Sequence, residues 1–221
     1  MKNIEKYLEL LTSIDIFEGI NSSDLMSLIN CAEGSTCTYP KNTAIILAGD
    51  KVEFLGIVLS GEALIMKEKA DGMRTIISSL ETGDYFAETI CFSKSGISPV
   101  SVIASSDVTV LKLNFAKVVS TCTNSCSFHA KLISNLLRIV ANKNLVLQQH
   151  LDVLSKRNIE GKILTFLEYY KDPDSDYITI PFSREEMADY LCVDRTALSH
   201  QLSKMKREGK IDYFKNQFRL Y

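Results

Sequence analysis

The fold of this chain is decided by residues 181–221, which read PFSREEMADYLCVDRTALSHQLSKMKREGKIDYFKNQFRLY. Ser183 and Glu186 have the spacing of a capping box, in which a hydroxyl and a carboxylate each satisfy a backbone amide at the start of a helix. Asp194 offers an N-cap for a second helix, and Gly209 is a natural stop after it. The stretch therefore predicts a helix, a tight turn and another helix.

Both predicted helices have apolar residues at the three- and four-residue spacing of a single buried face. After the second helix, apolar residues alternate on either side of Lys215, Asn216 and Gln217, which is typical of a small β-hairpin. The stretch is therefore predicted to be a helix-turn-helix with a hairpin wing. The apolar positions are Met187, Ala188, Leu191, Ala197, Leu198, Leu202, Met205, Ile211, Tyr213, Phe218 and Leu220.

A helix-turn-helix places its second helix in the major groove of DNA, and the charges of this chain agree with that use. From Arg195 onward, lysine and arginine outnumber aspartate and glutamate by about five, although the whole chain has a net charge of -2. A solvated charged face is the plainer explanation of such a run, but this one coincides with the caps, the turn and the wing. We expect base or phosphate contacts from Arg195, Thr196, Ser199 and His200, and phosphate contacts from Lys204, Lys206 and Lys215.

Residues 35–113 carry short apolar runs separated by turns that contain glycine, such as Gly49-Asp50 and Gly83-Asp84. Such spacing predicts an antiparallel jelly roll or β-roll, which can enclose a small ligand. Upstream, residues 1–11 and the segment after Ser22-Ser23 are predicted helices. Downstream, a short helix near residues 115–120 precedes the longest periodic segment, from about residue 127 to residue 154.

This long helix has apolar residues on more than one side, from Leu132 to Leu154. One face can pack on the β-roll while another meets an identical helix in coiled-coil fashion, which predicts a homodimer. His129 and His150 flank the helix, either as haem ligands or pH sensors or as surface and interface residues. The predicted class is α+β: a sensor domain at 1–124, a dimerisation helix at 125–154 and a winged helix-turn-helix domain at 155–221, with an N-cap at Ser155.

The run MADYLCVDRTALSHQLSKMKREGKI resembles the DNA-binding helices of the Crp/Fnr family of bacterial transcription regulators, and YPKNTAIILAGDKVEFLGIVLSGEALI resembles that family's cyclic nucleotide-binding fold. The resemblance covers nearly the whole chain. It implies a dimer that binds a palindromic double-stranded DNA operator, with RNA polymerase as a further candidate partner. Arg195 falls on a family DNA-contacting position, whereas Thr196 and His200 replace a glutamate and an arginine of that pattern. The operator is therefore not predicted to be that of the well-known members.

Residues 84–104 correspond to the family's phosphate-binding cassette, where true cyclic-nucleotide binders have Gly-Glu and, about ten residues later, an arginine followed by serine or threonine. This chain has Ala87-Glu88 and later Ser98-Pro99, so the arginine is absent and proline supplies no N–H for a phosphate. We therefore expect an unidentified small-molecule effector other than cyclic AMP. Glu88 either contacts that effector or bonds the cassette's own backbone. The candidate pocket residues are Glu88, Ser98, Arg74, Leu147 and Gln148, the last two at positions where cyclic-AMP binders meet adenine.

The six cysteines stand in a chain whose N-terminus does not look like a secretory signal and whose apolar runs are too short to span a membrane. We therefore expect a cytoplasmic protein with reduced thiols and without a bound metal or cofactor. A thiol- or metal-based redox sensor on the same fold is the alternative, and a ligand-binding module without DNA activity is a third reading. No hydrolase, P-loop, zinc-protease or dinucleotide motif is present in the sequence, so we predict that the protein is not an enzyme. The cysteines are Cys31, Cys37, Cys91, Cys122, Cys126 and Cys192.

Overall fold

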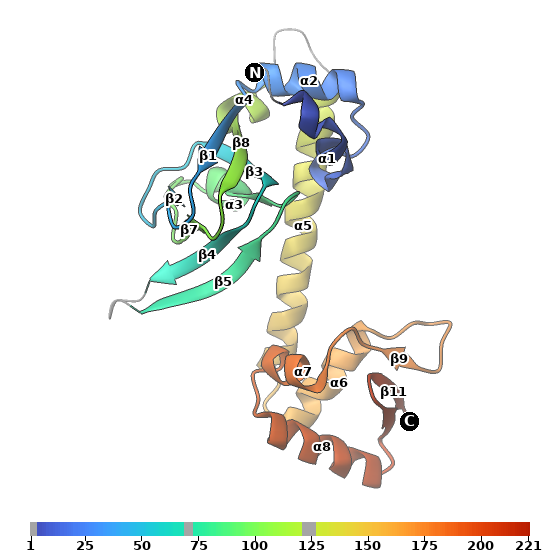
Figure 1. The fold of residues 1–221 in the computed structure, drawn as a ribbon. Coiled ribbons are helices and arrows are strands. Elements are labelled where there is room, and N and C mark those ends of the chain that lie inside the picture. The colour runs from blue at the N-terminus through green and yellow to red at the C-terminus, as the bar shows by residue number, and fades with distance from the viewer. Residues whose placement is uncertain (1–3, 69–72, 121–126) are drawn as a thin grey trace. The chain divides into compact units, whose positions relative to one another are not determined.

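The computed structural model describes residues 4–68, 73–120 and 127–221, and the chain forms two compact units. We call Met1–Val140 the β-rich unit and Ala141–Tyr221 the head (Figure 1). The helix α5 (Ser127–Ser155) contributes its first part to the β-rich unit and its remainder to the head. The predicted long helix is thus confirmed.

The β-rich unit is built on two antiparallel four-stranded sheets, in the orders β1-β8-β3-β6 and β2-β7-β4-β5. This arrangement confirms the predicted β-roll. Its strands are β1 (Ser35–Tyr39), β2 (Ala44–Ile46), β3 (Phe54–Ser60), β4 (Ala63–Glu68), β5 (Arg74–Leu80), β6 (Tyr85–Phe86), β7 (Ser101–Ala104) and β8 (Val108–Asn114). Its short helices are α1 (Leu8–Ser13), α2 (Ser22–Cys31), α3 (Glu88–Phe92) and α4 (Phe115–Val119), with the 3-10 turns η1 (Glu5–Tyr7) and η2 (Asp15–Phe17).

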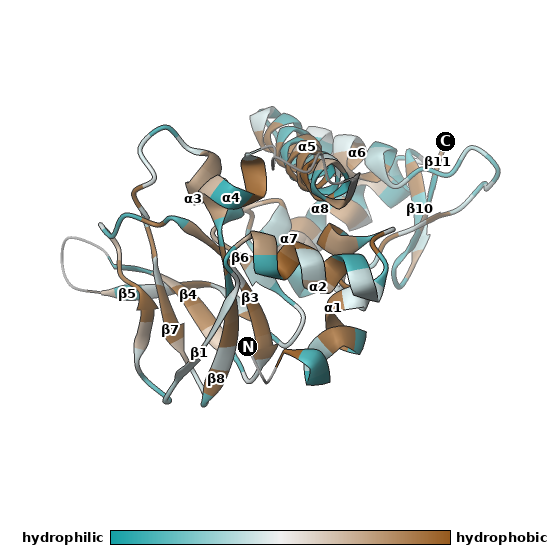
Figure 2. Cartoon of the chain, turned by 90° about the horizontal axis from the view of Figure 1, so that it is seen from above, coloured by the Kyte–Doolittle hydropathy of each residue, from teal (hydrophilic) through white to brown (hydrophobic). Residues whose placement is uncertain are grey.

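Strand β3 is apolar almost throughout because it is covered on both faces, whereas the polar residues of β8, Thr109, Lys112 and Asn114, are only half-buried (Figure 2). Leu55 and Ile57 of β3 belong to a core that also holds α1, α2 and the first part of α5, whereas Val58 faces the interior between the two sheets. The turn after β3 requires glycine at Gly61, since its φ is +82° and a Cβ there would lie 2.2 Å from the Asp107 carbonyl oxygen.

Polar contacts attach the first part of α5 to the N-terminal segment. The Asn135 amide donates to the carbonyl oxygens of Ile16 (3.0 Å) and Glu18 (2.9 Å), and Arg138 forms an ion pair with the Glu18 carboxylate.

The sequence prediction of one helix over residues 1–11 was wrong here. The described part of that segment is a 3-10 turn followed by α1, and residues 1–3 lie outside the described ranges.

The head contains the end of α5, the helices α6 (Ile159–Tyr169), α7 (Arg184–Tyr190) and α8 (Arg195–Arg207), and a three-stranded sheet of order β10-β11-β9. Its strands are β9 (Ile178–Thr179), β10 (Ile211–Phe214) and β11 (Gln217–Leu220). The predicted helix-turn-helix and hairpin wing are thereby confirmed. The proposed N-cap at Ser155 was wrong: α5 continues through Ser155, and Asn158 caps α6 by accepting from the Gly161 amide at 2.7 Å.

Candidate nucleic-acid interface

The first helix of the motif, α7, begins with the predicted capping box. The Ser183 hydroxyl oxygen accepts from the Glu186 amide at 3.3 Å, and the Glu186 carboxylate accepts from the Ser183 amide at 2.7 Å. The hydrogen bond from the Ser183 amide, followed by the interaction with the Ser183 side chain, lowers the pKa of the Glu186 carboxyl. Met187 and Ala188 are buried behind the cap, so α7 is fixed both at its end and along its face.

The turn between α7 and α8 has the hydrogen bonds of a Schellman motif. The Val193 amide donates to the Ala188 carbonyl and the Cys192 amide donates to the Asp189 carbonyl, each at 3.0 Å. Cys192 occupies the left-handed position of this motif, with a φ of +50°, where glycine is the usual residue. The Asp194 carboxylate then starts α8 by accepting from the Thr196 and Ala197 amides at 2.8 and 3.0 Å.

Helix α8 has a buried face and an exposed face. Leu198, Leu202 and Met205 pack in the head core. The predicted contact residues of this helix, Arg195, Thr196, Ser199, His200, Lys204 and Lys206, are exposed, and the first four lie together in its N-terminal half. Ser203 and Arg207 are also exposed, at seven and eleven residues from Thr196, and therefore on the same side. The sequence analysis named neither as a DNA contact, although this spacing places both beside Thr196.

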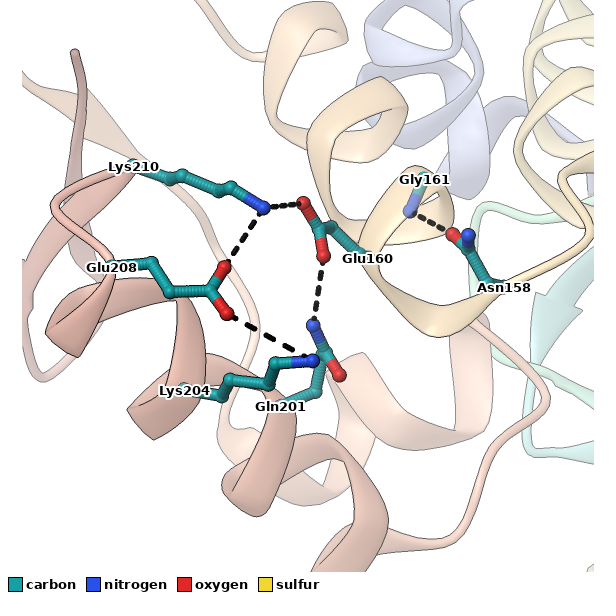
Figure 3. A network of polar contacts seen from close by, with 7 residues as sticks. All are labelled: Asn158, Glu160, Gly161, Gln201, Lys204, Glu208 and Lys210. Atoms are coloured by element: carbon teal, nitrogen blue, oxygen red, sulfur yellow. Dashed lines mark hydrogen bonds and ion pairs between the residues drawn. The ribbon is translucent and has the colours of Figure 1, made fainter.

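Carboxylates of the head already pair with several of its lysines (Figure 3). Glu160 of α6 accepts from the Lys210 ammonium at 2.6 Å and from the Gln201 amide at 3.2 Å. Glu208 lies 2.8 Å from the same Lys210 nitrogen and 3.8 Å from that of Lys204. The hydrogen bonds that the Lys210 ammonium donates to the Glu160 and Glu208 carboxylates raise the pKa of Lys210. The network ties α8 and the entry to the wing to the N-terminus of α6.

Lys206 is paired in the same way, since its ammonium lies 2.5 Å from the Asp212 carboxylate, which raises the Lys206 pKa. Two of the predicted phosphate contacts, Lys204 and Lys206, thus have carboxylate partners within the head. Phosphates that bind these lysines have to compete with those carboxylates.

The wing turn is attached to the start of α7. Lys215, at a φ of +52°, is exposed, and its carbonyl oxygen accepts from Arg184 Nη2 at 2.6 Å. The Arg184 guanidinium also lies over the rings of Tyr213 and Phe218, at 5.0 and 4.7 Å from their centroids. Arg184 and Lys215 contribute to the lining of an open cavity of about 380 Å³ between α7 and the wing. Sequence reasoning assigned no role to Arg184, because its partners are distant in the chain.

Three of the candidate effector residues belong to the β-rich unit, and they differ in burial and in hydrogen bonding. Glu88 is buried and opens α3, directly after Ala87, which has a φ of +70°. Ser98 is fully buried, and its hydroxyl donates to the Val100 carbonyl at 2.6 Å. Arg74 is exposed on β5, 3.5 Å from the Glu68 carboxylate, beside a cavity of about 50 Å³.

The other two candidate effector residues, Leu147 and Gln148, are exposed on α5, in the part that belongs to the head. In the β-rich unit, burial raises the pKa of the Tyr85 phenol, and the negative charges of Asp15 and Glu88 raise it further. The Glu88 carboxylate thus contributes to the electrostatic environment of Tyr85.

The described cysteines differ in environment. Cys91 is half-buried, and its thiol donates to the Phe54 carbonyl at 3.3 Å; burial raises its pKa to about 11. Cys31 and Cys37 are half-buried and Cys192 is exposed. Within residues 4–68, 73–120 and 127–221, no three potential ligands among His, Cys, Asp and Glu are grouped as a metal site would require. Cys122 and Cys126 lie outside the described residues.

The two histidines expected to flank the long helix both lie within α5, and their surroundings differ. The His150 ring stacks on Tyr190 at 4.2 Å, and its Nε2 lies 2.8 Å from the Tyr190 carbonyl at the end of α7. His129 is buried beside Phe128.

No helix in the described part of the chain is long and apolar enough to cross a membrane.

Comparison with known proteins matches both parts of the chain. Residues 36–125 match the family model of the cyclic nucleotide-binding domain, and residues 161–220 match that of the Crp-like helix-turn-helix domain. The cAMP-activated global transcriptional regulator Vfr of Pseudomonas aeruginosa is 24% identical over 181 residues, which cover 78% of this chain and 83% of Vfr. The transcriptional activator protein FnrL of Cereibacter sphaeroides is 24% identical over 195 residues, covering 79% and 71%.

Among solved structures, the catabolite activator protein of Thermus thermophilus aligns with a TM-score of 0.56 at 18% identity, covering 94% of this chain and 93% of that one. The β-roll, the capped helix pair and the basic exposed face of α8 define a DNA-binding transcription regulator with an effector-binding domain. The chain is a member of the Crp/Fnr family.

Proposed function

We propose that the protein is a homodimeric transcription regulator that binds a palindromic operator through the exposed face of α8. The observation that carries this proposal is the exposure of Arg195, Thr196, Ser199 and His200 at the capped N-terminal end of that helix. Residues at this end of a recognition helix meet base edges in the major groove. Lys204, Lys206 and Lys215 are the proposed phosphate contacts.

The dimer is proposed to form through α5, because large apolar side chains on this helix are exposed. Leu137, Leu145, Val146, Leu147 and Leu151 are each more than half accessible. A second copy of α5 would cover many of them and would set the spacing of two recognition helices at about 34 Å, one turn of the duplex.

The proposed regulator divides into a sensor domain at 1–124, a dimerisation helix at 125–154 and a DNA-binding domain at 155–221. It acts in the cytoplasm and performs no catalysis, and RNA polymerase is a further partner to test. An effector changes DNA binding only if it binds one arrangement of the dimer more tightly than another.

We infer that this effector is not cyclic AMP, although relatives such as Vfr are cAMP-activated. Support comes from Ser98, whose hydroxyl is buried and bonded to its own loop where an arginine would pair the phosphate, and from Pro99, which lacks an N–H. Arg74 does not substitute, since its cavity of about 50 Å³ is far below the 300 Å³ or so of a typical ligand site. Glu88, Leu147 and Gln148 remain the proposed effector contacts.

Enrichment of a random duplex library on the purified protein tests the DNA-binding proposal. A palindrome with half-sites one turn apart, bound with a steep salt dependence, is the expected result. The Arg195→Ala variant should lose about 1–3 kcal/mol of discrimination between the operator and mismatched duplexes, whereas Arg157→Ala, an exposed arginine outside α8, should keep it. An Arg195→Ala variant with full discrimination would refute this assignment.

Calorimetric titration with cyclic AMP and cyclic GMP tests the effector proposal. No saturable heat is expected at millimolar ligand, and one-site binding at micromolar concentration would overturn it. The titration is independent of DNA, so it separates the effector question from the operator question.

The redox-sensing alternative rests on the exposed thiol of Cys192 and on the cysteines outside the described ranges. Cys91 is a poor candidate, because a thiol with a pKa of about 11 is hardly ionised at neutral pH. Visible absorbance of anaerobically purified protein, or loss of operator binding on mild oxidation, would favour this alternative. A colourless protein whose DNA affinity is unchanged by oxidant would exclude it.

A further inference from the structure

The wing tip, residues 214–217, exposes a large apolar side chain. Phe214 and Gln217 face each other across β10 and β11, and Lys215 and Asn216 form the two-residue turn between them. All four residues are exposed, and Phe214 is 72% accessible. The turn is narrow, so the head presents an aromatic ring, an ammonium group and two amides within four consecutive residues.

Hydrogen bonds hold the wing tip on two sides. The Lys215 carbonyl oxygen accepts from Arg184 Nη2 at 2.6 Å. The Asn216 side-chain amide donates to the Ile180 carbonyl, and the Ile180 amide donates to the Asn216 carbonyl, each at 3.0 Å. A ring carried on a fixed turn loses little conformational freedom when it binds, so Phe214 is preorganised for contact with a partner.

Phe214 lies on the face of the wing that adjoins α8. Asp212 precedes it by two residues on β10, so the two side chains point to the same face of the sheet. Lys206 of α8, a proposed phosphate contact, pairs with Asp212 at 2.5 Å. Lys206, Asp212 and Phe214 contribute to the lining of one open cavity of about 280 Å³. A duplex whose phosphates reach Lys206 therefore passes close to Phe214.

The side chains of the wing tip are those that minor-groove binders use. Lysine, asparagine and glutamine read the base edges and the width of that groove, and phenylalanine acts as a wedge between stacked bases in proteins that kink DNA. The minor groove is about 6 Å wide, which is too narrow for a helix but admits the side chains of a tight turn. A phosphate contact by Lys215 needs no neighbouring ring, because a phenyl group neither carries charge nor donates a hydrogen bond.

We propose that the wing tip enters the minor groove next to each half-site and that Phe214 inserts between two base pairs there. This inference rests on the proposed DNA binding and adds a second reading element to α8. Pyrimidine–purine steps such as TA and CA unstack most easily, so the operator carries one of them where the wing tip reaches it. Insertion kinks the duplex toward the major groove by about 20–90°.

Selection from a duplex library with randomised flanks tests the role of Phe214. The parent should prefer a pyrimidine–purine step at one flanking position by at least about fivefold. Phe214→Ser should lose this preference and keep those within the half-site, whereas Phe214→Leu should retain it, because leucine also acts as a wedge. Tyr221→Ser is the matched control, since it removes an aromatic side chain of the head that is 73% exposed outside the wing tip, and it should keep the preference. Equal flanking preferences in the parent and in Phe214→Ser would overturn the inference.

Fluorescence of 2-aminopurine placed at the flanking step measures insertion directly, because its emission rises when it loses a stacked neighbour. Binding of the parent and of Phe214→Leu should raise the emission, and binding of Phe214→Ser should not. The slope of affinity against salt should be the same in Phe214→Ser as in the parent, because the lost side chain carries no charge. Parent protein that binds the operator without a change in emission would refute insertion and leave the DNA-binding proposal intact. A parent chain that enriches no duplex at all would refute both.

Discussion

The turn of the helix-turn-helix holds a cysteine in a conformation that suits glycine. Cys192 has a φ of +50° at the left-handed position after α7. For a residue with a Cβ this conformation costs about 1–2 kcal/mol, and glycine avoids most of that cost. Glycine also has more freedom in the unfolded chain, which offsets about 0.5–1 kcal/mol. Cys192→Gly should therefore raise the free energy of unfolding of the head by about 1 kcal/mol.

Calorimetry of the full chain measures this change. For a unit of about 60–100 residues, 1 kcal/mol corresponds to a rise in melting temperature of about 4–8 °C in the transition of the head. Because the side chain is exposed, its removal leaves no cavity. Cys192→Ala is the control, since it removes the thiol and keeps the Cβ, and it should leave the transition unchanged. If the glycine variant melts no higher than the alanine variant, the left-handed backbone at Cys192 does not destabilise the head.

Three further predictions concern the start of α8, the attachment of the wing and the start of α7. Asp194→Ala should destabilise the head by about 1 kcal/mol through loss of the N-cap of α8, and Asp194→Asn should restore most of it; equal denaturation midpoints for both variants would contradict this. Arg184→Lys should lower the slope of operator affinity against salt by about 0.9, because Lys215 loses its fixed position. Arg219→Lys, on the other end of the wing, should not change that slope, and equal slopes in both variants would argue against Arg184. The lowered pKa of Glu186 stabilises the folded head above about pH 4.5, and this contribution disappears as the pH falls through the folded-state value. Unfolding of Glu186→Gln, followed from pH 6 to pH 3, should therefore depend less steeply on pH below 4.5 than that of the parent; identical profiles would remove Glu186 as the cause.

Local signals in the sequence were sufficient for the helix-turn-helix. Ser183, Glu186 and Asp194 satisfy amides within three residues of themselves, so their spacing alone predicts where α7 and α8 begin. The N-cap of α6 was misplaced because Ser155 and Asn158 are both good capping residues, and packing of the end of α5 in the head decides between them.

Contacts between distant residues escaped the sequence. Arg184 and Lys215 are 31 positions apart, and Glu160 and Lys210 are 50 apart. Nothing in the composition marks them as partners. The positive φ of Ala87 and of Cys192 was also hidden, because neither residue is a glycine, the usual signal for that conformation.

If Lys204 and Lys206 contact operator phosphates as proposed, their ion pairs with Glu208 (Figure 3) and Asp212 make operator binding by the head an ion-exchange step. A phosphate that takes Lys204 or Lys206 displaces a carboxylate, and that carboxylate is then left close to the negatively charged backbone of the duplex. Such an exchange is favourable only where other contacts of α8 hold the helix in place. We therefore expect the head to bind random DNA more weakly than the count of its basic residues suggests, and so to spend less time on the wrong sequence.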